Sequence, residues 1–345
     1  MSTWCVRAIL LSCLFVLSGL AQESVPAGRR ITLDVVVTDK SGKPVSGLEQ
    51  KDFTLLDNKQ PQKILSFEAV TGAGTTDPPV EVILLSDEVN TDFTNVSIER
   101  GQIEKFLMQG GGELPRPVTL AFLSDSGVRI GNITTQDGKA LMAELDQNKN
   151  GLRSITRDQG FYGASDRVGL SLKALQQLAD YEAPRPGRKL VIWLSPGWPL
   201  LTGPNNILSS KQEQEIFSQI VAISDSLRRA RITLDAIDPL GTNDAGGFRT
   251  FYYEQYVKGV KKSGQTQVGN LALQVIATQS GGRVLNSSND VSGEIATCVA
   301  DANAFYVLTF EGLPGDGPDE YHSLQIKLDR PGLKTLARTG YYAQP

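Results

Sequence analysis

The chain has 345 residues, of which 40% are hydrophobic and 21% are charged, and its formal net charge is −4. This composition is typical of a globular protein with a sizeable core and excludes a disordered chain, and the mildly acidic balance without a basic run argues against binding to nucleic acid or to an anionic membrane surface. The single histidine, His322, excludes a histidine-rich zinc site, and a Ser-His-Asp triad would have to use that one residue.

Residues 1–21 have the pattern of a secretory signal peptide. Arg7 gives a positively charged start, and residues 8–20 form an apolar run. Gly19 and Ala21 are small residues at positions −3 and −1 of the predicted cleavage site. The run is shorter than the roughly 20 apolar residues of a bilayer span, and we find no later segment that could cross a membrane. We therefore expect an exported protein, periplasmic or extracellular, without a membrane span after cleavage.

Cleavage of this leader would leave one cysteine. Cys5 and Cys13 would be removed, so the mature chain would hold only Cys298 and no intrachain disulfide. Cys298 falls on the apolar stripe of a helix expected around residues 291–302, and we expect it to be a buried core residue rather than a reactive thiol.

The segment 22–71 is rich in predicted strands. Residues 31–37 alternate between apolar and polar side chains, which predicts a half-buried strand, and residues 53–56 and 64–70 predict two more. Residues 71–79 are rich in Gly, Thr and Pro and are typical of a linker.

Residues 80–302 alternate between strands and helices. Short apolar runs predict buried strands, and helical stripes lie between or after them. Thr134 is expected to cap a helix whose first turn holds Asp137. Continuous apolar strands that alternate with helices indicate an α/β fold with a doubly wound, mostly parallel sheet. The predicted strands cover residues 80–85, 118–123, 190–194 and 232–237.

Strands return in the segment 303–345, at residues 305–310, 324–328 and 336–341. Two β-rich segments therefore bracket the α/β middle. Two arrangements stay open: the segments meet in one β-sandwich with the α/β unit inserted between them, or they form two separate β modules.

Several segments carry a resemblance to a known family. They are residues 35–67, Leu85-Ser-Asp-Glu-Val-Asn-Thr91, the segment 187–197, the segment 235–239, Tyr306-Val-Leu308 and Gly340-Tyr-Tyr342. An apolar strand that ends in Asp and precedes a helix resembles the start of a von Willebrand factor A (VWFA) domain, and the similarity runs over residues 80–302. With its flanking segments, the chain is similar to secreted acidobacterial proteins of this class. The resemblance implies a Rossmann-type domain over 80–302, flanked by the β-rich segments 22–71 and 303–345.

The resemblance also implies a metal-ion-dependent adhesion site, in which Mg²⁺ is held by an Asp-x-Ser-x-Ser loop, a Thr from a second loop and an Asp from a third. Asp87 matches the first position and Thr91 replaces the second Ser, whereas Val89 cannot bind a metal. Ser165 takes the Thr position by similarity, and Pro196 stands where the family often has Asp. We therefore expect a degenerate site with Asp87, Thr91 and Ser165 as the candidate ligands of Mg²⁺, an ion that prefers oxygen donors. The alternative is that Asp87 caps the following turn and that the two hydroxyls bond to backbone N–H groups.

Two long loops that follow strands on the same face hold Trp198 and the tyrosines Tyr252, Tyr253 and Tyr256. Aromatic side chains with interspersed cations suit a protein-binding surface, so these four residues are candidate partner contacts. The alternative is an insert whose aromatic side chains pack onto the body of the domain.

These features lead to one functional hypothesis and two alternatives. The hypothesis is an exported protein-binding module of VWFA type, adhesive or scaffolding, that engages a protein or a carboxylate-bearing ligand at the Asp87 face with or without Mg²⁺ and with no other cofactor. The first alternative is a metal-independent structural or assembly protein of the cell envelope. An enzyme is not expected, because the carboxylates Asp235 and Asp238 are attributed to structure and the chain has no nucleophile motif.

Overall fold

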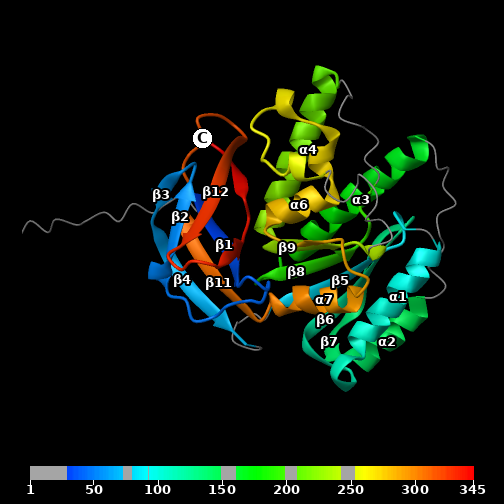
Figure 1. Ribbon diagram of the computed structural model, residues 1–345. Coiled ribbons are helices and arrows are strands. Elements are labelled where there is room, and N and C mark those ends of the chain that lie inside the picture. The colour runs from blue at the N-terminus through cyan, green and yellow to red at the C-terminus, as the bar shows by residue number, and fades with distance from the viewer. Residues whose placement is uncertain (1–28, 73–79, 92, 149–160, 199–207, 242–252) are drawn as a thin grey trace, which may run out of the picture.

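The computed structural model describes residues 29–72, 80–91, 93–148, 161–198, 208–241 and 253–345, and the predicted leader lies outside these ranges. The described chain forms an antiparallel part and an α/β part that lie side by side (Figure 1). The strands of the antiparallel part are β1 (Arg30–Thr38), β2 (Phe53–Asp57), β3 (Gln60–Gln62), β4 (Ile64–Thr71), β11 (Ala304–Glu311), β12 (Glu320–Leu328), β13 (Lys334–Leu336) and β14 (Gly340–Ala343).

The two ends of the chain build the antiparallel part together. One sheet has the order β13-β1-β11-β4 and the other has the order β14-β12-β2-β3, so each contains strands from both β-rich segments. In the first sheet Ile31 pairs with Phe310, and in the second Leu55 pairs with Ile326. Two separate β modules therefore do not describe this structure.

The two antiparallel sheets enclose one apolar core. Side chains alternate between the two faces of a strand, so Ile31, Leu33, Val35 and Val37 of β1 all point to the same side. They pack with buried side chains from strands of the opposite sheet, such as Leu55 of β2. The arrangement is that of a small sandwich in which each sheet covers the apolar face of the other.

The α/β part contains a six-stranded sheet of order β10-β9-β8-β5-β6-β7. Every neighbouring pair is parallel except β6 and β7, so the mostly parallel sheet predicted from the apolar runs is confirmed. The central strands are buried on both faces, which explains their uninterrupted apolar sequences. The strands are β5 (Glu81–Asp87), β6 (Glu113–Ser124), β7 (Gly127–Asp137), β8 (Lys189–Leu194), β9 (Ile232–Ile237) and β10 (Val284–Leu285).

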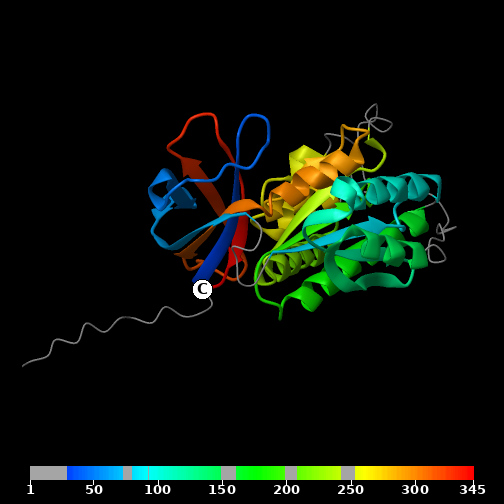
Figure 2. The same ribbon diagram turned by 90° about the horizontal axis from the view of Figure 1, so that it is seen from below.

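Helices cover both faces of this sheet (Figure 2). One apolar cluster joins α3, α4 and α6 to the sheet, and a second joins α1, α2 and α7 to its other face. Cys298 of α7 is fully buried in the second cluster, as its place on the apolar stripe predicts. In the described ranges no helix is long and apolar enough to cross a membrane. The helices are α1 (Phe93–Leu107), α2 (Gly138–Gln147), α3 (Phe161–Glu182), α4 (Ser210–Arg229), α6 (Leu273–Ser280) and α7 (Val291–Ala300).

The edge strand β7 corrects one sequence prediction. Thr134 does not cap a helix but lies within β7, where its hydroxyl is 2.7 Å from the hydroxyl of Thr119 on β6. The cap of α2 is Asp137, whose carboxylate accepts from the N–H groups of Lys139 and Ala140. The sequence pattern missed β7 because an edge strand with a largely exposed face lacks the apolar alternation that identifies a strand.

The predicted strand 336–341 is also corrected, because it is two short strands on different sheets. β13 pairs with β1, whereas β14 pairs with β12. Residues 337–339 carry the chain from one sheet to the other. Since both sheets face the same core, the apolar pattern runs through this crossover without a visible break.

Candidate functional site

The candidate site lies where β5 ends, at the carboxyl edge of the parallel sheet. β5 is flanked by β8 and β6, and the loop from Asp87 to Thr91 leads from its end toward α1. Ligands of open α/β sheets bind at this edge, because the strand ends and the loops that follow them converge there. The structure therefore puts the acidic loop that the sequence singles out at the expected edge of the fold.

The carboxylate of Asp87 is fully buried and receives four hydrogen bonds. Its Oδ1 accepts from the backbone N–H groups of Val89, at 2.9 Å, and Asn90, at 3.0 Å. Its Oδ2 accepts from the side-chain amide of Asn90, at 2.8 Å, and from the indole N–H of Trp193, at 3.1 Å. Two donors on each oxygen make Asp87 the cap that fixes the β5 turn, which is the alternative role that its sequence position allows.

The two candidate hydroxyl ligands, Thr91 and Ser165, lie in different environments. Thr91 is buried in the loop, and its Oγ1 has no hydrogen-bond partner among the described residues. Ser165 is exposed in the first turns of α3. The α3 hydroxyl that contacts the loop is that of Ser171, which accepts from the amide of Asn90 at 2.9 Å. Ser171 lies six residues, or about 9 Å along the helix, beyond Ser165, and Ser165 as a metal ligand stays a prediction.

This donor set does not fit Mg²⁺ as folded. Both oxygens of Asp87 are already engaged by protein N–H groups, and Val89 contributes no oxygen donor from its side chain. Ser165 is exposed near the start of α3. In the described ranges, no group of three or more histidine, cysteine or acidic residues is arranged to hold a metal ion. A hard cation that requires near-octahedral oxygen coordination would have to replace several of these hydrogen bonds.

Two further acidic side chains lie at the loop: Glu88, which is part of it and next to Asp87 in the sequence, and Glu99 of α1, which the sequence does not link to it. Glu99 of α1 is fully buried, and its Oε1 accepts from the hydroxyl of Ser86 at 2.6 Å while its Oε2 has no partner among the described residues. Glu88 is 3% exposed. Burial and the neighbouring Asp87 raise the pKa of Glu88 to about 8, and burial also raises the pKa of Glu99 well above its usual range. We call Asp87, Glu88 and Glu99 the β5 acidic cluster.

The raised pKa of Glu88 predicts how stability depends on pH. In the unfolded chain Glu88 ionises near pH 4.5, whereas in the folded protein it keeps its proton up to about pH 8. Between these values the folded state binds more protons, so the free energy of unfolding falls as pH rises. We expect the melting temperature to fall from pH 5 to pH 8, and to fall less in Glu88→Gln, as measured by thermal melts across this range.

The matched control for this measurement is Glu68→Gln, at an exposed position on β4. Burial also raises the pKa of the buried carboxyl groups of Glu182 and Asp235 and of the half-buried Glu294, so Glu88→Gln reduces the slope without abolishing it. A slope as steep in Glu88→Gln as in the unmodified protein and in Glu68→Gln would contradict the assignment.

The predicted aromatic contact surface is corrected by burial. Trp198 is 3% exposed, its indole N–H donates to the carbonyl of Leu271 at 2.8 Å, and its ring meets Trp193 edge-on at 5.6 Å. Tyr256 is also buried, and Tyr253 packs against the same small cluster. The prediction that Trp198 and Tyr256 face a partner is therefore wrong, because both rings fill core space. Tyr252 lies outside the described residues.

The strand-end carboxylates of β9 have structural contacts. Asp235 is buried, its Oδ1 accepts from the backbone N–H of Arg283 at 2.6 Å, and burial raises its pKa to about 6. Cys298 hydrogen-bonds to the same carboxyl group. These contacts tie α7 and the segment before β10 to the end of β9, which agrees with the structural interpretation of Asp235.

Comparisons with known proteins do not assign the chain to a family. No protein-family model matches it, and no curated protein matches its sequence. Similar solved structures include proximal thread matrix protein 1 from the mussel byssus, at 15% identity over 69% of this chain and 49% of that chain, with a TM-score of 0.31. A crystal structure of the pilus adhesin SpaC from Lactobacillus rhamnosus GG is similar at 9% identity over 87% of this chain and 49% of that chain, with a TM-score of 0.38.

A VWA domain is also among the similar structures. The similarity to the SpRpn10 VWA domain extends over 61% of this chain and 87% of that domain, with 11% identity and a TM-score of 0.25. The chain spans about half the length of the mussel and SpaC chains. At these scores and identities the likenesses carry no argument about partners or activity.

Proposed function

We propose that the chain is an exported protein-binding module of VWFA type, which engages its partner at the β5 acidic cluster without a metal ion. Export rests on the leader pattern of residues 1–21. The VWFA assignment rests on the strand that ends in Asp87, on the segments quoted with it, and on the order of strands and helices in residues 80–302. The buried polar atoms and the carboxyl groups of the β5 acidic cluster support this cluster as the place where the partner binds.

One observation carries the proposal: three buried polar atoms in and beside this loop have no hydrogen-bond partner among the described residues. Among the described residues, Asn90 Oδ1, Thr91 Oγ1 and Glu99 Oε2 are buried and accept no hydrogen bond. An unsatisfied buried polar atom costs roughly 1–3 kcal/mol. Costs of this kind, together with shifted carboxyl pKa values, gather at functional sites more often than elsewhere. A ligand that donates hydrogen bonds would satisfy these acceptors.

The charge of the cluster indicates the chemistry of the partner group. Arg100 and Arg129 lower the pKa of Glu88, yet that pKa stays near 8, so these two cations do not offset burial and the charge of Asp87. A cation that approaches the cluster favours the ionised form of Glu88, whereas a carboxylate disfavours it, so the cluster suits a cationic donor. We therefore assign a lysine or arginine side chain of the partner to this site, entering beside the half-buried Asn90.

The proposal is tested with peptide arrays of opposite charge. At pH 9, above the pKa of Glu88, we expect the full chain to retain lysine- and arginine-rich peptides and to retain them equally in EDTA and in Mg²⁺. Glu88→Gln should lose at least about tenfold in affinity at this pH, because an uncharged amide attracts a cation less than the ionised carboxylate. The matched control is Glu320→Gln, on a half-exposed side chain of β12 in the antiparallel part. Binding is measured by biolayer interferometry.

Two results would overturn the proposal. Retention of aspartate- and glutamate-rich peptides that is lost in EDTA would establish a metal-dependent adhesion site instead. Equal binding of basic peptides by the unmodified chain, Glu88→Gln and Glu320→Gln would place the contact elsewhere on the surface.

A further inference from the structure

A polar cavity lies at the junction of the antiparallel part and the α/β part, far from the β5 acidic cluster in the fold. Its walls come from β1, from the end of α4 and the turn into β9, and from the crossover between β13 and β14. The polar side chains that line it are those of Thr32, Asp34, Arg228, Arg231, Thr233, Ser280 and Arg338.

Three arginines meet at this cavity, and their charges are incompletely matched. Arg231 forms a close ion pair with Asp34, with Nη2 at 2.5 Å from Oδ1. Arg228 reaches Asp225 at 3.4 Å, and its buried Nε has no hydrogen-bond partner among the described residues. Two of the three guanidinium groups therefore have a carboxylate neighbour, and one of these two contacts is long.

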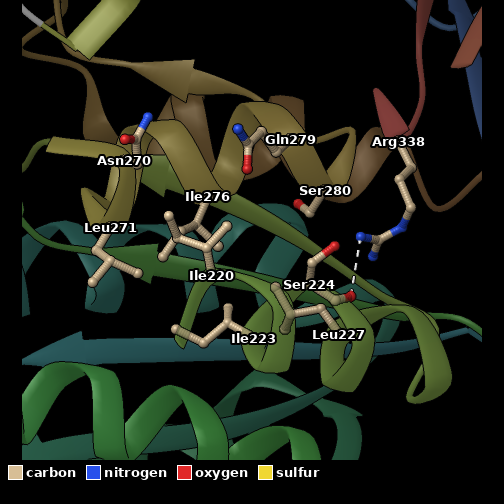
Figure 3. Close-up of a pocket in the computed structure, with 10 residues that line it drawn as sticks. All are labelled: Ile220, Ile223, Ser224, Leu227, Asn270, Leu271, Ile276, Gln279, Ser280 and Arg338. Carbon is tan, nitrogen blue, oxygen red and sulfur yellow. Dashed lines mark hydrogen bonds between the residues drawn. The ribbon is translucent and has the colours of Figure 1, made fainter. Parts of the chain in front are cut away.

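Arg338 is the arginine without a carboxylate partner. In the described part of the chain it forms no ion pair, and its one hydrogen bond runs from Nη1 to the backbone carbonyl of Ser224 at 3.4 Å (Figure 3). Figure 3 also shows the apolar hollow between α4 and α6 that borders the arginine cavity, with Arg338 at its polar end. Burial, and then the neighbouring Arg228, lower the pKa of Arg338 to about 10, and the carboxylates of Asp225 and Asp34 only partly oppose this shift.

We propose that this cavity binds a small oxyanion of the phosphate class, held by Arg228, Arg231 and Arg338. Guanidinium groups present N–H donors in a planar fork that suits phosphate oxygens, and hydroxyls of Thr32 and Thr233 line the same space. The cavity volume is about 20 Å³. A single water needs roughly 10–15 Å³ on the same measure, so the space takes about one oxygen of such an anion and is too small for a nucleotide.

Such an anion would link the two parts of the fold. Arg228 and Arg231 belong to the α/β part, whereas Arg338 belongs to the crossover between the two antiparallel sheets. An oxyanion shared by these side chains would compensate the unmatched charge on both sides of the junction. Binding should therefore stabilise the whole chain and not one part alone, because it favours only the arrangement in which the three side chains converge.

The test compares phosphate with chloride at equal ionic strength, using isothermal titration and thermal melts of the full chain. We expect saturating phosphate to raise the melting temperature by about 5 °C and chloride to leave it unchanged. Arg338→Gln should weaken phosphate binding at least about tenfold. Arg338→Lys should have an affinity between those of the unmodified chain and Arg338→Gln, since lysine keeps the charge but lacks the planar fork of N–H donors. O-phosphoserine in place of phosphate tells whether the natural source is a free ion or the phosphoryl group of a larger ligand.

The matched control is Arg229→Gln, at the exposed arginine that neighbours Arg228 on α4. It should bind phosphate as the unmodified chain does. Equal stabilisation by chloride and phosphate would overturn the oxyanion assignment, and so would full-strength phosphate binding by both Arg338→Gln and Arg228→Gln. Removing a cation that has no ion-pair partner should leave Arg338→Gln folded, which its melt without phosphate checks.

Discussion

Replacing Asp87 with alanine should destabilise the protein by about 3 kcal/mol, because it leaves four donors around one buried site without an acceptor. The donors are the N–H groups of Val89 and Asn90, the amide of Asn90 and the indole of Trp193, and water cannot readily replace the carboxylate in a fully buried position. For a chain of this size the melting temperature should fall by about 4 °C. Differential scanning calorimetry measures the change.

Asp39→Ala is the matched control for this variant. Asp39 also caps a turn and also accepts several hydrogen bonds, from Ser41 and Lys43, but its side chain is exposed, so water takes over the bonds when it is removed. Its melting temperature should stay close to that of the unmodified chain. The same melts, run in Mg²⁺ and in EDTA, should coincide. A rise in Mg²⁺ that disappears in Asp87→Ala would contradict the hydrogen-bonded role of Asp87 and restore the metal site.

Asp57→Ala should be at least as damaging, by roughly 3–5 kcal/mol, because it empties the centre of a buried polar network in the antiparallel part. Asp57 is fully buried, with Oδ1 at 3.0 Å from Nδ1 of His322. Its Oδ2 accepts from the hydroxyl of Tyr341 at 2.6 Å and from the N–H of Leu313 at 3.2 Å. These partners lie on or beside strands from the opposite end of the chain, so the loss should weaken the pairing of the two ends. Chemical denaturation followed by tryptophan fluorescence and far-UV circular dichroism would measure it.

Two variants make this result specific. Tyr341→Phe removes one hydroxyl and keeps the ring against Phe310, so it should cost less than Asp57→Ala. Asp329→Ala, at an exposed carboxylate just past β12, should have no measurable effect. If Asp57→Ala unfolded at the same denaturant concentration as Asp329→Ala, the network would have no role in stability.

The network around Asp57 also shows what sequence patterns leave out. Asp57 reads as part of a turn after a predicted strand, and His322 borders an alternating strand with no visible partner. The two residues are separated by 265 positions along the chain, yet their side chains meet in the core. Periodicity reports which face of an element is buried, but it holds no information about which distant element covers that face.

The candidate site also combines residues that stand out in the sequence with residues that only the fold brings to it. Asp87 stands out in the sequence because it ends an apolar run, and Asn90, three residues later, is close enough to be linked to it. Ser171, Trp193 and Glu99 reach the same site from two helices and a neighbouring strand, and only their packing reveals it. Ser165 was favoured because family similarity aligns loops, whereas the helical turn decides which hydroxyl points at the loop.

The sequence by itself determined most of the buried elements of this protein. Uninterrupted apolar runs marked β5, β6, β8 and β9, helical stripes marked α1, α3, α4 and α7, and the position of Cys298 on such a stripe marked its burial. Each of these features depends on local spacing, because a strand or helix that buries a face must repeat apolar residues with its own period.

The tertiary structure alone decided how the elements combine. It paired the two β-rich ends into shared sheets, split the segment 336–341 between them, turned Trp198 inward, and brought three arginines to one cavity. Burial depends on what packs against a side chain, and hydrogen-bond partners depend on distances between residues far apart in sequence. These properties come from the arrangement of the whole chain, so no window of neighbouring residues contains them.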